Sequence, residues 1–185
     1  MIRVLLVSGH PAIRHGLAHV ISREPGFVVE ASASADAAVE GLWHVEPDVV
    51  LIDAPLGPES GFELCHRLKQ LAHPQRVAVY ASPARDEARV AAWLAGADAL
   101  IDKSQATDHL LDVIRTAVRG PRTLARPPRT AIQGAAGGLD PPETSIFGMC
   151  LYNVPLDEIS RTLRIDPLDV EARVHALLGR LGAAA

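Results

Sequence analysis

The chain contains 185 residues, 48% of them hydrophobic and 22% charged, and its formal net charge is −4. This composition is that of an ordinary globular protein of one or two domains, which excludes the disordered and fibrous classes, and the acidic balance provides no overall basic field for nucleic acid. Because no apolar stretch reaches the roughly 18 residues of a membrane-spanning helix and the N-terminus has no signal-peptide pattern, we expect a cytoplasmic protein without a membrane partner.

The first 120 residues alternate between short apolar runs and segments with helical spacing. The runs are nearly continuous and rich in β-branched residues, which is typical of strands covered on both faces. They occupy residues 4–7, 27–29, 49–52, 77–80 and 99–101. Five strands that are each followed by a helix predict an α/β fold, with a doubly wound parallel sheet and helices on both faces.

This alternation stops near Gly120. Residues 121–138 are rich in Pro, Gly and Ala and carry three arginines without an acid, which predicts a linker that is stiff at its prolines and loose at its glycines. Residues 139–185 have no strand pattern and predict a small all-α domain of three helices: one after Pro141, one over 156–163, and one after Asp166-Pro167. Asp166 is expected to cap the third helix, with Pro167 at its first position. The sequence therefore predicts two domains, 1–120 and 139–185.

Ligands of doubly wound sheets bind beyond the carboxyl ends of the strands. Asp53 ends the third predicted strand and Lys103 ends the fifth, so the two side chains should attract each other. Lys103 could also neutralise a phosphoryl group on Asp53. The first and fourth strands end in smaller residues, at Ser8-Gly9 and Ala81-Ser82.

The stretches RVLLVSGHP, PDVVLIDAPLGPESG and AGADALIDK, together with the order of strands and helices, resemble a response-regulator receiver domain, which has a flavodoxin-like (βα)5 fold. The resemblance implies that Asp53 stands at the position of the phosphoacceptor. It places Gly61 at the glycine eight residues later, and Lys103 at the lysine that follows the fifth strand.

Four positions depart from the receiver pattern. Ser8 and Gly9 stand where receivers carry two acids that hold Mg²⁺, Ala81 stands where they carry Thr or Ser, and Leu100 stands where they often carry an aromatic ring. Since Mg²⁺ prefers carboxylate ligands, we expect Mg²⁺ binding to be lost and no other cofactor or metal to replace it. The sequence favours an ion pair between Asp53 and Lys103 in a vestigial pocket, and leaves open a small-molecule ligand there. Ser82 is a poor substitute for the missing hydroxyl, because successive strand residues point to opposite faces.

Residues 139–182 resemble a LuxR-type helix-turn-helix, so the whole chain resembles a NarL/FixJ-family response regulator. The resemblance implies that the helix after Asp166 enters the major groove of double-stranded DNA. Acids in the contact region should repel phosphates, although a carboxylate can accept a hydrogen bond from cytosine. The candidate contacts are Arg161, Arg164, Asp169, Glu171, Arg173, His175 and Arg180.

Three hypotheses follow for function. The first is a DNA-binding transcriptional regulator that acts, as a dimer, largely independently of aspartyl phosphorylation. The second is an interaction protein that binds DNA weakly or not at all and heterodimerises with an intact response regulator. The third is phosphorylation of Asp53 by a sensor kinase despite the altered pocket. An enzyme is not expected, because the sequence has no nucleophile–base pair, Gly-rich phosphate loop or metal-ligand cluster.

Overall fold

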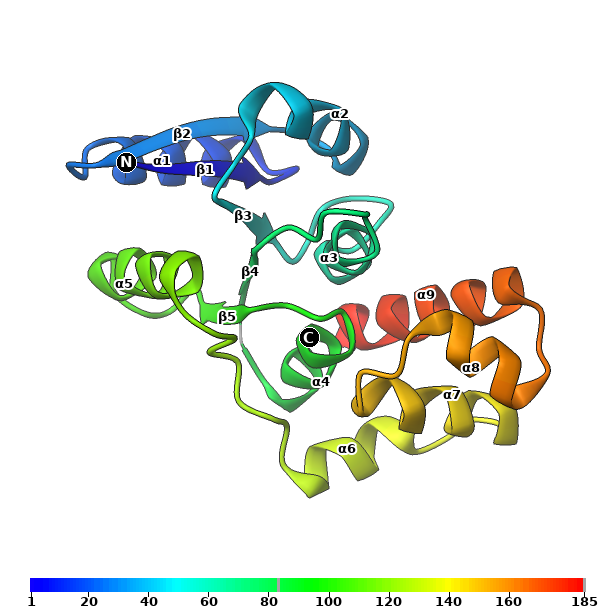
Figure 1. The fold of residues 1–185 in the computed structure, drawn as a ribbon. Helices are drawn as coiled ribbons and strands as arrows, with labels where there is room; N and C mark the ends of the chain where they lie inside the picture. The colour runs from blue at the N-terminus through cyan, green and yellow to red at the C-terminus, as the bar shows by residue number, and fades with distance from the viewer. Residues whose placement is uncertain (83, 185) are drawn as a thin grey trace.

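Five parallel strands form the central sheet of the protein (Figure 1). The computed structural model describes residues 1–82 and 84–184. The strands lie side by side in the order β2-β1-β3-β4-β5, as in a doubly wound sheet, which confirms the predicted fold class. Their bounds are β1 Ile2–Val7, β2 Phe27–Ser32, β3 Val49–Asp53, β4 Val77–Ala81 and β5 Ala99–Asp102.

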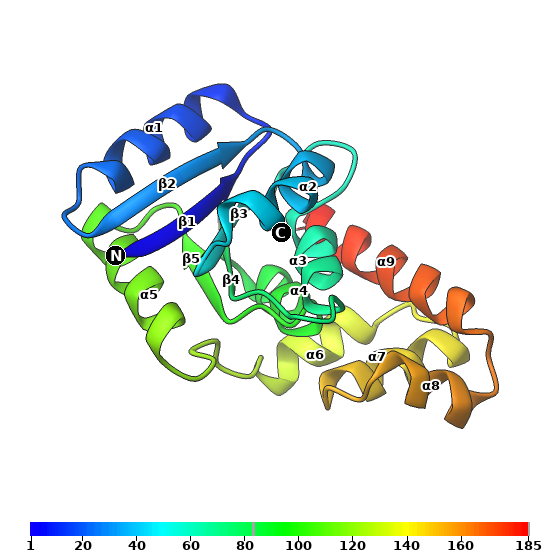
Figure 2. The same cartoon turned by 45° about the horizontal axis from the view of Figure 1, so that its top comes forward.

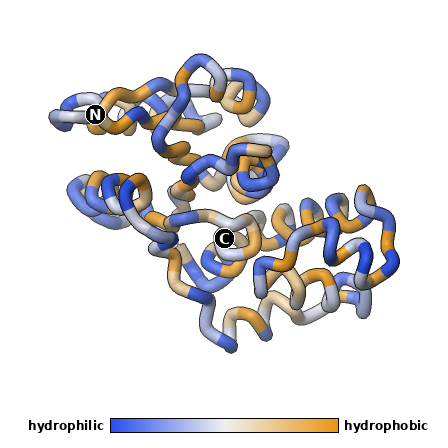
Figure 3. The backbone as a smooth tube through the Cα atoms, in the orientation of Figure 1, coloured by the Kyte–Doolittle hydropathy of each residue, from blue (hydrophilic) through white to orange (hydrophobic). Residues whose placement is uncertain are grey.

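Helices cover both faces of this sheet (Figures 1 and 2). Helices α1 (Pro11–Ser22) and α5 (Thr107–Arg119) pack on one face, where Ile21 and Ile114 are fully buried against the strands. Helices α2 (Ala35–Val45), α3 (Gly61–Lys69) and α4 (Asp86–Leu94) pack on the other. Because both faces are covered, the central strands are apolar up to their carboxyl ends: in β3, four apolar residues precede Asp53, and the hydrophobic colour of this strand is visible in Figure 3.

The C-terminal part contains the three predicted helices: α7 (Pro141–Leu151), α8 (Leu156–Leu163) and α9 (Pro167–Ala184). Side-chain caps mark the N-termini of α7 and α9. The Asp140 carboxylate accepts a hydrogen bond from the N–H of Glu143, whose own carboxylate accepts one from the N–H of Asp140. Asp166 caps α9, since its carboxylate accepts a hydrogen bond from the N–H of Leu168 at 2.8 Å.

The predicted linker differs from expectation, because residues 129–136 form an additional helix, α6 (Arg129–Ala136). Pro128 provides the extended residue before this helix, and Ala131 is buried against the apolar cluster that includes α4. A helix of 8 residues is marginal by itself in water, so the helical state of α6 depends on tertiary packing that the sequence pattern does not reveal.

The C-terminal helices dock on the α3–α4 side of the sheet and share one apolar cluster with it. Helix α9 packs against both α3 and α4, and Leu177, Leu178 and Leu181 are buried there. The indole N–H of Trp93 on α4 donates a hydrogen bond to the carbonyl of Leu151 at the end of α7, at 3.0 Å. No helix in the part of the chain that the structure describes is both long and apolar enough to cross a membrane.

Candidate functional site

The carboxyl ends of β1, β3 and β5 bring Ser8, Asp53 and Lys103 together. The Asp53 side chain is 1% exposed. Its Oδ2 accepts a hydrogen bond from the Ser8 hydroxyl at 2.8 Å. Its Oδ1 accepts no hydrogen bond among the described residues, and instead lies against the ammonium of Lys103. Both carboxylate oxygens are therefore occupied by groups of the protein itself.

The loop after β3 closes this pocket over Gly9. A Cβ atom added to Gly9 would lie 2.9 Å from the carbonyl oxygen of Leu56, a buried residue of that loop. Gly61 is tighter still, because a Cβ there would lie 2.6 Å from the carbonyl oxygen of Asp53. With the loop in this position, the backbone leaves no room for an acidic side chain at residue 9.

The end of β4 supplies a methyl group to the pocket. Ala81 is 1% exposed, and its carbonyl accepts a hydrogen bond from the N–H of Lys103 at 2.9 Å. Ser82, the next residue, is exposed. The Lys103 ammonium also lies 5.4 Å from the ring centroid of Tyr80. Burial, and then the charges of Asp53 and Asp102, raise the pKa of Tyr80, so its hydroxyl remains neutral.

The C-terminal end of helix α9 lies near the loop that follows β3. A cavity of about 390 Å³ lies between the loop after β3 and the end of α9, and its walls include Pro55, Ser82, Gly179 and Gly182. Asp53 does not line it. Across residues 1–82 and 84–184, the structure contains no group of three or more His, Cys, Asp or Glu side chains placed to hold a metal ion.

The predicted DNA-contact residues divide into two sets. Four of them lie on α8, directly after it or at the start of α9, and are exposed: Arg161, Arg164, Asp169 and Glu171. Arg161 pairs with Asp157 along α8 at 2.8 Å, where both side chains are largely in solvent. This part of the surface therefore presents carboxylates beside its arginines.

The other three predicted contacts lie further along α9, each 3.5 Å from a carboxylate of the molecule, although the Arg180 side chain is also 51% exposed. Arg173 pairs with Asp140, Arg180 pairs with Glu143, and Nδ1 of His175 lies opposite Glu63 of α3. The resemblance to a helix-turn-helix predicted that these side chains face DNA, because they lie on the helix expected to enter the major groove. The structure turns them toward α3 and α7, because this side of α9 packs on those helices.

Sequence reasoning missed His66 of α3, which lies where α3 meets α9. It is 5% exposed, its Nε2 has no hydrogen-bond partner among the described residues, and its ring is edge-on to that of His175 with centroids 6.2 Å apart. Burial, and then the neighbouring His175, lower the pKa of His66 to about 4. No motif contains His66, so only the docking of α9 distinguishes it from a surface histidine.

Comparison with known proteins agrees with this architecture. Residues 4–115 match the response regulator receiver domain. Over 98% of its length the chain is 30% identical to the transcriptional regulatory protein UhpA of Salmonella typhimurium and covers 92% of it. It is 25% identical to the nitrate/nitrite response regulator protein NarL of Escherichia coli, with 96% of this chain and 88% of NarL covered. A crystal structure of a LuxR-family two-component response regulator from Aurantimonas is 29% identical and has a TM-score of 0.62, over 71% of this chain and 93% of that one.

Proposed function

Because the chain belongs to the response regulator family, and its full-length relatives include transcriptional regulators such as NarL and UhpA, we propose that it is a transcriptional regulator that binds double-stranded DNA as a dimer and does not depend on phosphorylation of Asp53. Its receiver domain then acts as a fixed scaffold for dimerisation and partner docking. The C-terminal helices supply the DNA-binding surface.

The closed environment of Asp53 carries this proposal. A phosphoryl acceptor must present a carboxylate oxygen to its donor, and Mg²⁺ normally balances the charge that develops. Here Ser8 and Lys103 occupy the two oxygens of Asp53, whose side chain is 1% exposed. Gly9 offers no carboxylate for Mg²⁺, and the carbonyl of Leu56 fills the space beside it. Several parts of the phosphorylation machinery are thus replaced together.

Incubation of the full chain with acetyl phosphate and Mg²⁺, followed by a phosphate-affinity gel, tests this point. We expect no shifted band for the natural chain. A shifted band that disappears in Asp53→Asn would instead support the third hypothesis, in which a sensor kinase still phosphorylates Asp53.

The proposal that the protein binds DNA rests mainly on its relatives. The charged side chains of α8 and α9 determine the affinity that we expect. Arg164 is exposed and takes part in no ion pair among the described residues. The other basic candidates, Arg161, Arg173, His175 and Arg180, lie beside carboxylates that they must first leave. Fewer free cations release fewer counterions from DNA. We therefore propose weak binding with a shallow dependence on salt.

A second candidate function follows from the exposed acids. Asp169 and Glu171 lie at the start of α9, where they would face the DNA backbone and repel it. This favours a protein that binds DNA only as a heterodimer with an intact response regulator. Genome-wide binding of the tagged full chain, in cells with and without such a relative, separates the two candidates. Sites recovered without the relative support the homodimer, and sites recovered only with it support the heterodimer.

A further inference from the structure

A second cavity lies on the opposite side of β5 from the contacts of Asp53, among α4, β5, α5 and the chain that follows α5. Its volume is about 420 Å³, within the range of small-molecule sites in proteins. Neither Asp53 nor Lys103 lines it, so it is distinct from the pocket around the Asp53 carboxylate.

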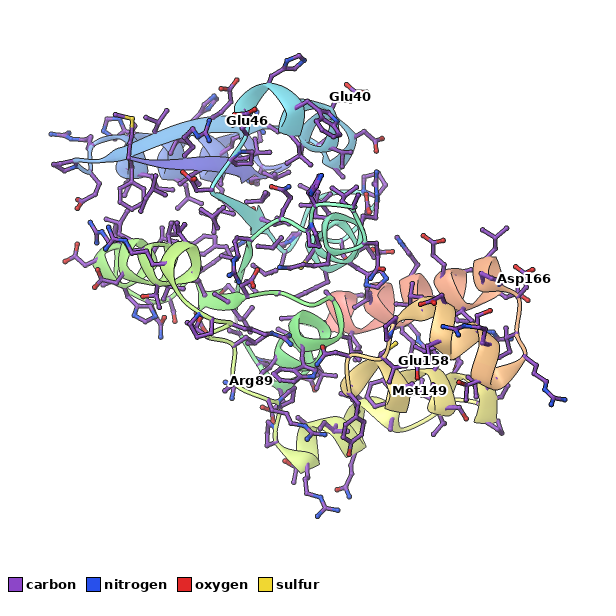
Figure 4. The ribbon with its side chains drawn as sticks, in the orientation of Figure 1. Glu40, Glu46, Arg89, Met149, Glu158 and Asp166 are labelled. Carbon is purple, nitrogen blue, oxygen red and sulfur yellow. The ribbon has the colours of Figure 1, made fainter. Side chains whose placement is uncertain are left out.

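Arg89 of α4 is the cationic group of this cavity. Elsewhere in the described chain, Arg76 and Arg115 pair with acids, whereas the half-buried side chain of Arg89 takes part in no ion pair or hydrogen bond there. Figure 4 shows Arg89 on the flank of α4 that faces away from α7, α8 and α9. The guanidinium is thus held beside the cavity with its donors uncommitted.

The carboxylate that lines the cavity, Asp102, makes no ion pair with Arg89 and is hydrogen-bonded to other groups. Its Oδ1 accepts hydrogen bonds from the N–H and hydroxyl of Ser104 at 2.8 and 2.6 Å, and its Oδ2 accepts one from the N–H of Ala84 at 3.0 Å. These bonds hold the pKa of Asp102 below its usual value. Gln105 and His109 also line the cavity, and in the described part of the chain their side chains make no hydrogen bond. The uncommitted polar groups are therefore mainly donors.

Thr123 adds a hydroxyl to the lining, and its larger apolar side chains come from separate elements: Leu100 from β5, Val113 from α5 and Leu124 from the following segment. An apolar wall with an unpaired guanidinium fits a ligand that has a compact hydrophobic body and one anionic group. We propose that this cavity binds a small organic anion, with its carboxylate, sulfonate or phosphate at Arg89 and its apolar part against Leu100.

We expect a ligand in this cavity to affect the C-terminal helices through the chain segment that follows α5. The N–H groups of Thr123 and Leu124 both donate to the carbonyl of Asp98, at 2.9 and 3.0 Å. One residue earlier, the guanidinium of Arg122 stacks on Trp93 at 3.9 Å, and Trp93 donates to Leu151 of α7. A ligand that contacts Leu124 thus contacts the same chain segment whose Arg122 stacks on Trp93, the residue of α4 that is hydrogen-bonded to α7.

The test uses 8-anilinonaphthalene-1-sulfonate, an aromatic sulfonate whose fluorescence rises on binding, and the neutral N-phenyl-1-naphthylamine, both titrated into the folded full chain. We expect saturable binding of the sulfonate at one site and much weaker binding of the neutral probe. Arg89→Met should weaken sulfonate binding by about tenfold or more, since it removes a charge-assisted hydrogen bond. Arg85→Met is the matched control, because Arg85 is exposed one residue before α4 and does not line the cavity.

Two further variants test whether the sulfonate binds in this cavity or elsewhere on the protein. Leu100→Trp should abolish sulfonate binding by filling the cavity. Trp43→Ala should leave it unchanged, because Trp43 lines a different apolar groove, between α2 and the end of α3. Amide chemical-shift mapping with naphthalene-1-sulfonate should place the changes at residues 99–105, 109–113 and 123–125. Equal sulfonate affinity in Arg89→Met and the natural chain, or loss of binding in Trp43→Ala alone, would overturn the proposal. Because this site does not include Asp53, neither result bears on the proposed function.

Discussion

The groups around the Asp53 carboxylate determine whether it can accept a phosphoryl group. The same residue type at the end of β3 would accept a phosphoryl group if it were exposed beside a metal site. In this protein Ser8 and Lys103 turn it into a buried, internally satisfied carboxylate. A buried ion pair adds little stability compared with apolar residues, but loss of one partner leaves an uncompensated charge.

Lys103→Met is expected to lower the free energy of unfolding by about 3–5 kcal/mol, because it leaves the Asp53 carboxylate buried without its counter-charge. The double variant Asp53→Asn/Lys103→Met should regain much of this loss, since the charge that needed compensation is gone. Urea denaturation of the three chains measures the difference. Equal stability of the single and double variants would show that the charge contact does not hold Asp53.

Gly9 is the second residue whose role depends on a close neighbour. Gly9→Ala should cost about 1–3 kcal/mol, because the new Cβ meets the carbonyl of Leu56 and the loop after β3 must move. Gly16→Ala is the control: Gly16 lies in α1 with open space around it, so alanine should stabilise the helix by up to about 1 kcal/mol. Thermal or urea unfolding of both variants checks the contrast, and a neutral Gly9→Ala would mean that the loop is not fixed against β1.

At the scale of elements, the contact between α3 and α9 joins the two parts of the chain through polar groups. His66, His175 and Glu63 meet there, and Glu63 also accepts a hydrogen bond from the N–H of Ser60 at the start of α3. The buried ring of His66 has no hydrogen-bond partner at Nε2 among the described residues. Protonation of that ring would place a charge in the contact.

This arrangement predicts a pH dependence of stability. The pKa of His66 is about 4 in the folded protein and about 6.5 when the chain is unfolded, so the neutral ring favours folding. The stabilisation is complete above about pH 6.5, falls as the pH drops through that value, and is lower by about 3 kcal/mol near pH 4.

Urea unfolding between pH 7.5 and 5 should therefore show stability falling on acidification, with a smaller fall in His66→Leu. His44→Gln is the control, because His44 is exposed at the end of α2. An unchanged slope in His66→Leu would assign the acid sensitivity to other groups.

At the scale of the whole molecule, the C-terminal helices and the sheet domain share one apolar cluster. Leu178 of α9 is fully buried in it, whereas Leu168 at the start of the same helix is 74% exposed. A shared core couples the unfolding of the two parts, because helices that lose this contact expose apolar surface on both sides.

Leu178→Ala should destabilise the chain by about 2–5 kcal/mol, whereas Leu168→Ala should change its stability by less than about 0.5 kcal/mol. Trp93 contacts α7, whereas Trp43 lies on α2. In a Trp93→Phe background, the fluorescence of Trp43 therefore reports on the sheet domain and far-ultraviolet circular dichroism on the whole chain. In Leu178→Ala, the unfolding transitions followed by fluorescence and by circular dichroism should move to lower denaturant concentration together. A fluorescence transition that stays in place while the dichroism transition moves would mean that the two parts unfold separately.

Much of the architecture could be predicted from the sequence, because it depends on local patterns. Continuous β-branched runs gave the five strands, helical spacing gave the helices between them, and Asp166-Pro167 marked the start of α9. The meeting of Asp53 with Lys103 also follows from local information, since the carboxyl ends of parallel strands lie at one edge of a sheet. Helix α6 could not be predicted in this way, because its buried side owes its environment to α4.

The sequence by itself determined the residue types at the strand ends: a hydroxyl and a glycine where receivers hold a metal, and a methyl group where they grip a phosphoryl group. Only the tertiary structure decided what surrounds them. Residues from different elements bring Leu56 to Gly9 and carboxylates to Arg173, His175 and Arg180. They also form the cavity beside Arg89, which has no ion pair among the described residues. The physical reason is that exposure and pairing are properties of packed surfaces, and packing joins residues that the chain keeps far apart.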